Sequence, residues 1–467
     1  MALGLGYGLP FAVQRPVEGF ANSIASSTAR AIVSGATQEQ AGGCLTGRAL
    51  TVMQTVQPQP SLLIVPQLYK AGALYPQLPT SASGDFTVTR ATTATRVNSS
   101  GLIESVASGV PRIDWLGQSC PALLVEPSGS NGIRNNSMVG ANVSTNALPT
   151  NWLTTLNGLS RQIIAIGTES GIDYIDIKLS GTANNTVATI APESSTQIVA
   201  ASGQTWTNSV YIKIISQPSP PSSYSLAFRE GTSGGSFVNS GSSAITPTTT
   251  LQRLSATRTL TGATTERVQP QINFALVSGS TYDFTVRIGW PQMEQSSVAT
   301  SPIPTTTGTG SRAADVISAS GALVSGLIGQ TEGTIYIEFN MQTLGVEGYA
   351  IRLVAASFDN SVHIRRSTAN LVTLELRSAA SGVFSQTFSA TGFVKAAIAY
   401  KSGDIAAFVN GTQAGSTSTS AFTFGASFTS VNLGTFGTAA FLNDRIRAAA
   451  LYTTRLTDAQ LAELTRL

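Results

Sequence analysis

The chain has 467 residues, of which 11% are charged and 7% aromatic, and its formal net charge is +3. This length predicts about two to four domains, and the low net charge argues against a nucleic-acid surface, which needs clustered Lys and Arg. Abundant Gly, Ser and Thr favour short strands joined by turns. The sequence contains no run of about 18 apolar residues, so no membrane span is expected.

Residues 1–60 show no steady period of 2 or 3.6. The opening "MALGLGYGLPFAVQRP" has no basic segment followed by an apolar run, so no secretory signal is expected there. We predict an irregular arm that becomes ordered on a partner. The two cysteines, Cys44 and Cys120, have neither a metal-binding nor a redox spacing. This pattern favours free, small core residues over a disulfide.

Residues 61–130 predict a small β-hairpin connector unit. "GDFTVTR" alternates, with Phe86 and Val88 on one face. "TRVNSSGLIESV" has two extended arms around Asn98–Gly101, a sequence suited to a hairpin turn. "PALLVEP" is a short apolar strand between two prolines.

Residues 131–305 predict a first large β domain. In "YDFTVRIGW", every second residue from Tyr282 to Trp290 is apolar, the pattern of a half-buried antiparallel strand. We expect Trp290 to be the last inward residue, because Pro291 removes a backbone donor. "SPIPTTT" favours a stiff, extended backbone and "GTGS" a short flexible joint. The segment up to Val316 is therefore predicted to be a semi-rigid strap between two domains.

Residues 306–467 predict a second β domain. "GTIYIEFN" and "LVTLELR" alternate, and "AIAYKSGDIAAFVNGT" suggests two strands joined by a tight turn. The end, "RLTDAQLAELTRL", has the capping-box residues Thr457 and Gln460, with Leu461 and Leu464 on one face. So short a helix is marginal alone and is expected to dock on the sandwich. The fold class predicted for the chain is all-β, with tandem antiparallel β-sandwiches, an irregular N-terminal arm and a short C-terminal helix.

Catalytic patterns are weak in this sequence. The single histidine, His363 in "SVHIRR", is expected to be a solvated strand residue that points away from Val362 and Ile364. No "GxSxG" elbow accompanies it. A glycosidase needs two placed carboxylates, and Asp315 is expected to make a local ion pair with Arg312. We therefore predict no enzyme, with polysaccharide hydrolysis as the weaker alternative.

Metal and cofactor signals are also weak. "FDNS" at 358–361 and "SGDI" at 402–405 offer oxygen ligands for calcium. Asp and Asn occupy turns for local hydrogen-bonding reasons too, and this second interpretation is favoured. No phosphate loop is present, since the Gly-rich stretches lack the required Lys. No metal and no cofactor are predicted.

Binding remains as a functional class, and glycans are one class of ligand to consider. Sugars are held by aromatic faces and a few polar groups. Trp206 and Tyr211 lie in "GQTWTNSVYIKI" at the start of a predicted strand, and Trp206 has polar neighbours. They are the candidate glycan-binding residues, although core packing is the favoured interpretation for Trp206. Trp290 shares a face with apolar residues, which favours packing in a core or domain joint.

Several motifs resemble those of tailed-bacteriophage structural proteins described as head spikes, head fibres or tail fibres. The similar segments are "DFTVTRATTATRVNSSGLIESVASGVPRIDW", "PALLVEP" and "GWPQMEQSSVATSPIPTTTGTGSRAADV". Trp115 stands where the family usually has tyrosine, and "SGSNGIRNN" replaces the usual "QRTNL". The end of the chain resembles concanavalin A-like or laminin-G-like lectin sandwiches. Together these similarities cover about residues 60–130 and 200–467.

The resemblance implies a carbohydrate-binding-module-like jelly roll at 131–305 and a lectin-like sandwich at 306–467. It implies a virion protein, assembled in the host cytoplasm and anchored to other virion proteins by residues 1–60. A homo-oligomer is expected, with a trimer favoured. The predicted function is weak, multivalent binding of cell-surface glycans. The alternatives are an architectural capsid or collar protein that binds other virion proteins, and a tailspike-type depolymerase.

Overall fold

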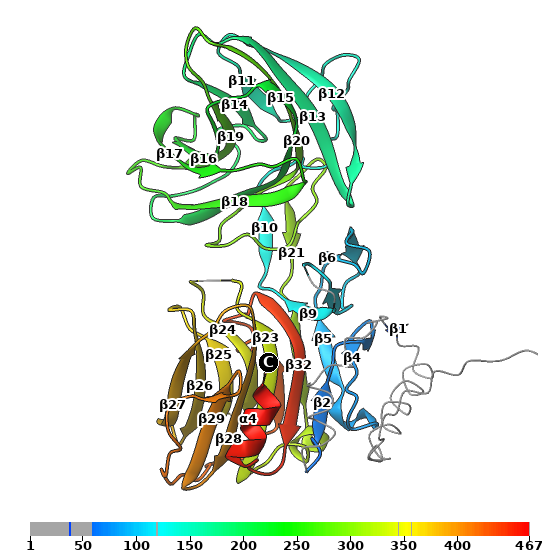
Figure 1. The fold of residues 1–467 in the computed structure, drawn as a ribbon, viewed down its shortest axis with the longest axis vertical. Helices are drawn as coiled ribbons and strands as arrows, with labels where there is room; N and C mark the ends of the chain where they lie inside the picture. Colours follow the sequence, from blue (N-terminus) through cyan, green and yellow to red (C-terminus); the bar gives the residue numbers. More distant parts are fainter. Residues whose placement is uncertain (1–36, 39–57, 118–119, 344, 356, 467) are drawn as a thin grey trace, which may run out of the picture.

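The computed structural model describes residues 37–38, 58–117, 120–343, 345–355 and 357–466. Most of the arm predicted at 1–60, and Cys44, lie outside them. The described chain is an all-β protein built from two antiparallel sandwiches, with one short helix at its C-terminal end (Figure 1). The predicted fold class is therefore confirmed, although the arrangement of the sandwiches differs from a simple series.

The first sandwich, drawn in green in Figure 1, has two five-stranded sheets. Alternating residues of "YIDIKL" and "YDFTVRIGW" point between them, so that Ile177, Phe284 and Ile288 are fully buried. One sheet has the order β11 (Leu153–Thr155), β14 (Val187–Ala191), β19 (Arg267–Ala275), β16 (Ser223–Gly231) and β17 (Phe237–Ile245). The other has the order β12 (Leu159–Glu169), β13 (Ile172–Thr182), β20 (Thr281–Glu294), β15 (Thr205–Ser219) and β18 (Gln252–Thr259).

The second sandwich packs a ten-stranded sheet on an eight-stranded one, and it holds the largest core of the described chain. The ten-stranded sheet has the order β1 (Thr37–Gln38), β3 (Leu68–Lys70), β4 (Ala73–Leu74), β5 (Phe86–Thr89), β22 (Val316–Ser320), β31 (Ser430–Leu433), β24 (Gly348–Val354), β25 (Ser361–Arg366), β26 (Leu371–Ser378) and β27 (Ser381–Ser389). The eight-stranded sheet has the order β30 (Thr412–Gln413), β29 (Asp404–Val409), β28 (Phe393–Lys401), β23 (Glu332–Asn340), β32 (Asp444–Tyr452), β9 (Ala122–Val125) and β8 (Arg112–Asp114), and β2 (Leu62–Ile64) also pairs with β32.

The predicted connector unit at 61–130 is not a separate body in the structure. Its strands belong to the sheets of the second sandwich: Leu63 pairs with Ala450, Val88 with Ile317, and Leu124 with Arg445. Only the hairpin of β6 (Ala94–Val97) and β7 (Ile103–Val106), with its turn at the predicted position, forms a sheet of its own. The unit was misassigned because β2, β5 and β9 pair with strands that lie hundreds of residues further along the chain.

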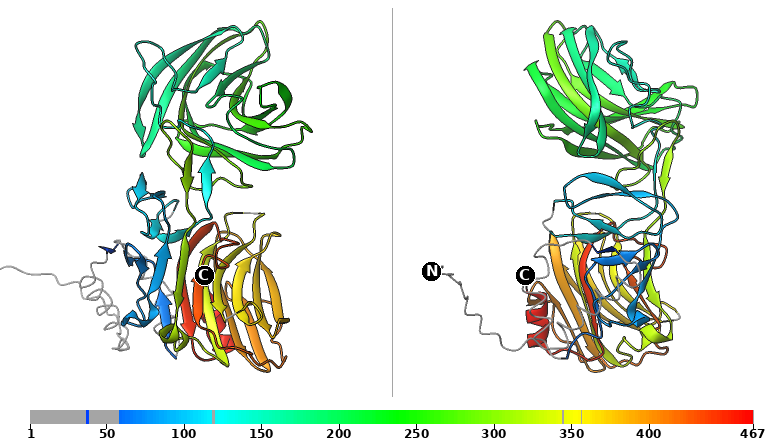
Figure 2. Two further views of the ribbon diagram at one scale, coloured as in Figure 1. Left: turned by 180° about the vertical axis from the view of Figure 1, so that it is seen from behind. Right: turned by 90° about the vertical axis from the view of Figure 1, so that its right-hand side faces the viewer.

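The first sandwich is therefore an insertion within the second. The chain leaves the second sandwich through β10 (Gly129–Asn131) and returns through β21 (Gly310–Arg312), and these two strands pair antiparallel. Figure 1 and both views of Figure 2 show this two-stranded neck between the sandwiches. A double connection restricts rotation more than the single strap predicted from the sequence.

The strand predicted to end at Trp290 continues to Glu294 through an irregularity in the pairing of β15 with β20. Trp290 has a φ of +35° at this point. The bulge shifts the alternation, so that Met293 rather than Trp290 enters the core. Trp290 is buried outside that core, with its indole N–H directed at Asp173. The pattern of "YDFTVRIGW" alone carries no signal for a bulge beyond its last residue.

The predicted strap is fixed by hydrogen bonds. The backbone N–H of Ile303 donates to the side chain of Gln292 at 2.7 Å, and the N–H of Thr305 donates to Asn136 at 2.7 Å. Both Ile303 and Thr305 are buried. Its stiffness therefore comes from contacts with the inserted sandwich as well as from its prolines.

The C-terminal helix α4 (Asp458–Thr465) forms as predicted, with Thr457 and Gln460 completing the capping box. Leu461 and Leu464 pack on the outer face of the eight-stranded sheet, where Ala397, Ala406 and Ala450 leave room for the helix. In the part of the chain that the structure describes, no helix is long and apolar enough to cross a bilayer. Cys120 is disulfide-bonded, so the prediction of a free cysteine there is wrong.

Candidate binding cleft between the sandwiches

A buried ion cluster holds the neck where the inserted sandwich leaves and rejoins the second one. Arg112 in β8 lies 2.6 Å from Glu126, at the end of β9, and also contacts Asp315, just after β21. Arg90 lies 2.9 Å from Asp315, and Arg312 lies 3.2 Å from Glu126. All five side chains are almost fully buried. Each of the three arginines lies beside at least one of the two carboxylates, in a place where an unpaired charge would be costly.

These residues come from the motifs on which the phage resemblance rests, namely "VTR", "PRID", "LLVEP" and "RAADV". The expected local pair of Arg312 with Asp315 is wrong, because each residue pairs with a more distant group. Sequence proximity suggested the local pair, but Arg312 lies within β21, whereas Asp315 follows that strand. A charged residue at the end of the fully buried run "ALLV" was the signal available in the sequence.

Glu126 accepts hydrogen bonds from Arg112, from the backbone N–H of Ser301 at 2.7 Å and from the Ser301 hydroxyl at 2.6 Å. Burial alone would raise the pKa of Glu126. The charges of Arg312 and Arg112 and the bond from Ser301 outweigh burial and hold this pKa well below its usual range. The carboxylate is therefore ionised at neutral pH and fixes the strap at Ser301.

The β6–β7 hairpin provides a second attachment of the inserted sandwich. The backbone N–H of Ile103 donates to the carbonyl of Ser170, in the β12–β13 turn, at 2.9 Å. Gly171 has a φ of +80°, and a Cβ built there would lie 2.1 Å from the Ile103 carbonyl oxygen. Only glycine fits this close approach in this backbone conformation. The hairpin and the neck together fix the inserted sandwich at two places.

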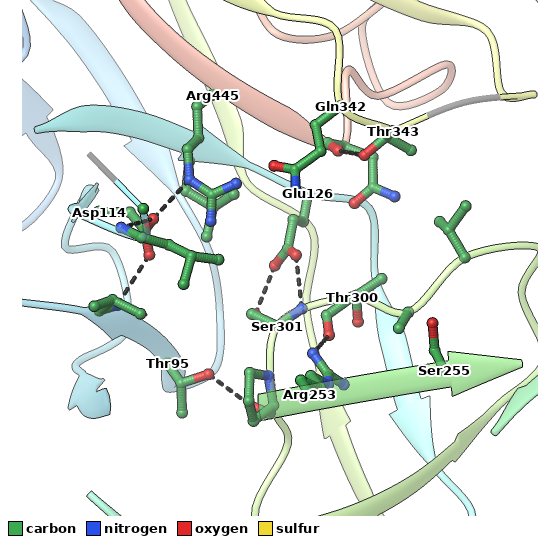
Figure 3. Close-up of a pocket in the computed structure, with 18 of the residues that line it drawn as sticks. Thr95, Asp114, Glu126, Arg253, Ser255, Thr300, Ser301, Gln342, Thr343 and Arg445 are labelled. Carbon is green, nitrogen blue, oxygen red and sulfur yellow. Dashed lines mark hydrogen bonds and ion pairs between the residues drawn. The ribbon is translucent and has the colours of Figure 1, made fainter. Parts of the chain in front are cut away.

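A cleft of about 1160 Å³ lies between these attachments and the two sandwiches. Figure 3 shows Arg445, Gln342 and Thr343 on the side of the second sandwich, and Arg253 and Ser255 on the opposite side. Glu126 and Ser301 lie between the two sides. Tyr211, Leu251, Phe393 and Pro302 add aromatic and apolar surface to this polar lining. Such a mixture of faces and polar groups is typical of ligand sites.

The two predicted glycan-binding residues lie in different places. Tyr211 lines the cleft, and the Arg253 guanidinium lies 5.7 Å from the centre of its ring. Trp206 is buried in the core of the inserted sandwich and lines a second cavity of about 500 Å³ beside the neck. Its indole N–H donates to Gln204 at 3.2 Å. The two residues are five apart on one strand and therefore face opposite sides of the sheet.

Arg445 projects into the cleft from β32, with Asp114 beside it (Figure 3). Its Nε donates to Asp114 at 2.6 Å. Asp114 also accepts from the backbone N–H groups of Val97 at 2.9 Å and Leu116 at 3.0 Å. Asp114 is thus saturated, and it orients the guanidinium. Sequence reasoning missed Arg445, because "NDRIRAAALY" gives no sign that the residue meets another domain.

The chemistry of the cleft suits binding better than hydrolysis. A glycosidase requires one carboxylic acid with a raised pKa as proton donor. The cleft is lined by two carboxylates, Asp114 and Glu126. The pKa of Glu126 is lowered by its arginine partners, despite its burial, and Asp114 already accepts three hydrogen bonds. Neither carboxylate has the environment of a general acid.

His363 points away from the core, as predicted, but the prediction that it is solvated is wrong. It is fully buried, with its ring 5.0 Å from that of Tyr349 and 5.9 Å from that of Phe358. Its Nε2 lies 2.9 Å from Glu375. Burial lowers the pKa of His363, and the bond to Glu375 offsets this only in part. Tyr349 from the neighbouring strand β24 and Phe358 from a loop cover this face of the sheet, which strand alternation does not predict.

The two candidate calcium segments are engaged in local contacts. Asp359 accepts from the Ser357 hydroxyl at 2.9 Å, and Asn360 accepts from the N–H groups of Ala379 and Gly425. Asp404 lies 2.7 Å from Arg455. Across the described ranges, no group of three or more His, Cys, Asp or Glu side chains gathers as a metal site would require. These contacts are those of turns and ion pairs.

No protein-family model matches the chain, and no curated protein matches it either. Solved structures with similar folds include the CBM40 module of a Ruminococcus gnavus IT-sialidase, at 17% identity and a TM-score of 0.28, covering 31% of this chain and 88% of that one. Domain 4 of the arabinanase AbnA of Geobacillus stearothermophilus, solved with arabinotriose, is 15% identical with a TM-score of 0.27, covering 33% and 73%. Mouse laminin alpha1 domains LG4-5 are 10% identical with a TM-score of 0.20, covering 57% and 84%.

Proposed function

We propose that this protein is a structural component of a tailed-phage virion and that its two sandwiches bind glycans in the cleft between them. The observation that carries the binding step is the cleft of about 1160 Å³, with aromatic, amide, hydroxyl and guanidinium groups on facing walls. Sugars need both apolar faces and hydrogen-bonding groups. The cleft offers Tyr211 and Phe393 for the former, and Gln342 and Asn443 for the latter.

The construction of the joint supports a binding role for the cleft. Its walls belong to different sandwiches, and their separation is set by the hydrogen bonds of buried Glu126 with Ser301 and by the contact of Ile103 with Ser170. A site held open in this way needs little rearrangement when a ligand binds, which favours affinity. The side-chain amide of Asn443 has no hydrogen-bond partner among the described residues and is available to a ligand.

The virion role rests on the sequence resemblance. The motifs that carry it supply Arg112, Glu126 and Asp315, which form one buried cluster, so they specify a structural joint in this chain. Residues 1–60 are proposed to anchor the protein to other virion proteins, and the protein is proposed to be a homo-oligomer, with a trimer favoured. Several copies on one particle would turn weak glycan contacts into stable attachment through effective concentration.

Glycan binding is tested with a glycan array probed by the full chain, as a monomer and as a multimer on beads. The multimer is expected to bind a subset of glycans, and Tyr211→Ala is expected to weaken that binding. Absence of binding by the multimer at every glycan density would contradict the proposal. The virion role is tested separately by immunogold microscopy of particles, with and without residues 1–60. Truncated protein should stay folded and be absent from the particles.

A second candidate function is architectural, with the sandwiches binding other virion proteins. The edge strand β12 favours it, because Ile164 and Ile166 there are 41% and 38% exposed. An edge strand with exposed apolar side chains is open to pairing with another chain. Ile164→Lys would then remove the protein from particles and leave the glycan array unchanged.

A further inference from the structure

The cleft contains a cation whose hydrogen-bonding capacity is only partly used. Arg445 is 8% exposed and lines the cleft, yet within the described chain the only hydrogen bond of its side chain is from Nε to Asp114. Among the described residues, its two terminal nitrogens have no hydrogen-bond partner, and Nη1 is 4.0 Å from the nearest oxygen of Asp444. These two nitrogens are not buried, unlike Nε of Arg253, so they open onto the cleft and can donate to a ligand there.

The carboxylates of the cleft cannot supply the missing acceptor. Asp114 is engaged by Arg445 Nε and two backbone N–H groups. Glu126 is engaged by Arg112, Arg312 and Ser301. The anions of the cleft are therefore saturated, whereas the cation retains two free donors on one planar edge. That edge matches the two oxygens of a carboxylate.

The opposite wall has a second arginine. Arg253 donates to the carbonyl of Thr300 and, at 2.9 Å, to the Ser209 hydroxyl, but it has no carboxylate partner among the described residues. Its buried Nε has no hydrogen-bond partner among the described residues. A ligand in the cleft thus lies between two guanidinium groups: Arg253 has no paired carboxylate in the described chain, and Arg445 is paired with Asp114 through Nε alone. Low-dielectric walls strengthen their attraction for an anion.

We infer that the cleft selects acidic glycans and that Arg445 binds the carboxylate of a sugar such as a uronic acid. Asp114 acts as a positioning residue, since it holds the guanidinium through Nε and leaves the other two nitrogens directed at the ligand. This inference rests on the proposed glycan binding and narrows it to one chemical class. Gln342, Asn443 and Tyr211 then contact the neutral parts of the sugar.

The test compares one oligosaccharide in two forms, using the full chain and isothermal titration calorimetry. Trigalacturonate carries the carboxylates, and its carboxyl-reduced counterpart is the neutral form of the same chain. The wild-type protein is expected to bind the acidic form at least about tenfold more tightly. Raising the salt concentration should weaken the binding of the acidic form alone, because salt screens the attraction between the carboxylate and the guanidinium groups.

Three variants locate the effect. Arg445→Gln should abolish the preference, so that the two forms bind alike, and Arg445→Lys should retain only part of it, because an ammonium group lacks the planar fork. The matched control is Arg455→Gln: its side chain is 9% exposed, against 10% for Arg445, and it pairs with Asp404 at 2.7 Å outside the cleft. This control should keep the full preference.

Equal binding of the two forms by the wild-type protein would overturn the inference, and so would a preference that survives in Arg445→Gln. Either result leaves glycan binding itself intact. If neither form binds and no glycan on the array binds, the result contradicts the proposed function instead. The comparison of ligands on the wild-type protein stays decisive even if Arg445→Gln does not fold.

Discussion

The guanidinium of Arg312 lies 3.2 Å from the carboxylate of Glu126, although the whole inserted sandwich separates the two residues in sequence. The same carboxylate lies 2.6 Å from Arg112. One buried acid thus joins the strand that leaves the second sandwich to the strand that returns to it. The relative position of the two walls of the cleft depends on this contact.

Replacing Glu126 with Gln should destabilise the second sandwich strongly. The change leaves Arg112 and Arg312 buried without a full counter-charge, and such a loss costs about 3–5 kcal/mol. Urea unfolding monitored by tryptophan fluorescence measures it. Glu104→Gln is the control, because that acid is 37% exposed in its pair with Arg96 and such pairs contribute about 1 kcal/mol or less. Equal losses in the two variants would contradict the assigned role of the cluster.

The stability of the fold should fall when the pH drops below about 6.5, the ordinary pKa of histidine. Burial lowers the pKa of His363, so the unfolded chain binds this proton at a higher pH than the folded chain does. The stability due to neutral His363 is thus present above the unfolded pKa and is lost as the pH falls through it. Urea midpoints between pH 8 and pH 5 measure this slope.

Because His363 is the single histidine, His363→Gln should flatten that slope. Glu126 contributes at lower pH, since its folded pKa lies below its unfolded one. Its stabilisation is complete above the unfolded pKa of about 4.3 and declines as the pH falls towards the folded value. Glu126→Gln should reduce this second, more acidic step and keep the first. Part of the step should remain, because the bonds of Glu375 to His363 and Arg365 outweigh its burial and lower its pKa to about 2. A slope near pH 6 that persists in His363→Gln would contradict the assignment.

Gly171→Ala should loosen the contact of the hairpin with the inserted sandwich. Both the φ of +80° and the carbonyl of Ile103 oppose a Cβ at this position. Gly203→Ala is a matched control, since its φ is +84° and nothing lies within 4 Å of a Cβ there. Hydrogen exchange of the Ile103 amide should accelerate in the first variant only. Equal exchange rates in both variants would mean that this contact does not hold the hairpin on the inserted sandwich.

Tyr211→Ala should weaken glycan binding about tenfold, which corresponds to about 1.4 kcal/mol. Tyr211 contributes aromatic surface to the cleft, whereas Trp206 lines another cavity and belongs to a core. Trp206→Phe keeps most of the apolar volume and should leave binding in the cleft unchanged. The glycan array and isothermal titration calorimetry measure the effect of each substitution on glycan binding. A larger effect from Trp206→Phe would move the site to the smaller cavity.

Local features were predictable from the sequence. The alternation from Tyr282 to Ile288 gave the strand β20, and Thr457 and Gln460 gave the start of α4. Each feature depends on neighbours within a few residues, because side-chain alternation along a strand and helix capping are both local effects.

Features that depend on distant partners were not predictable. The pairing of Val88 with Ile317, and of Leu63 with Ala450, makes the first sandwich an insertion. No period in the sequence records such pairs. The cleft could not be predicted for the same reason, because Arg253 and Arg445 line it from different sandwiches. Trp206 and Tyr211 were predicted as glycan-binding residues because they are aromatic and lie near polar residues. The sheet face to which each side chain points decides that Trp206 lies in the core and Tyr211 in the cleft.

A crystal structure of the full chain with trigalacturonate is the most direct test of acidic-glycan binding in the cleft. We predict density for the sugar in the cleft between Arg253 and Arg445, with one sugar carboxylate about 2.7–2.9 Å from the terminal nitrogens of Arg445. Sugar density beside Trp206 or on an outer face, with the cleft empty, would contradict it.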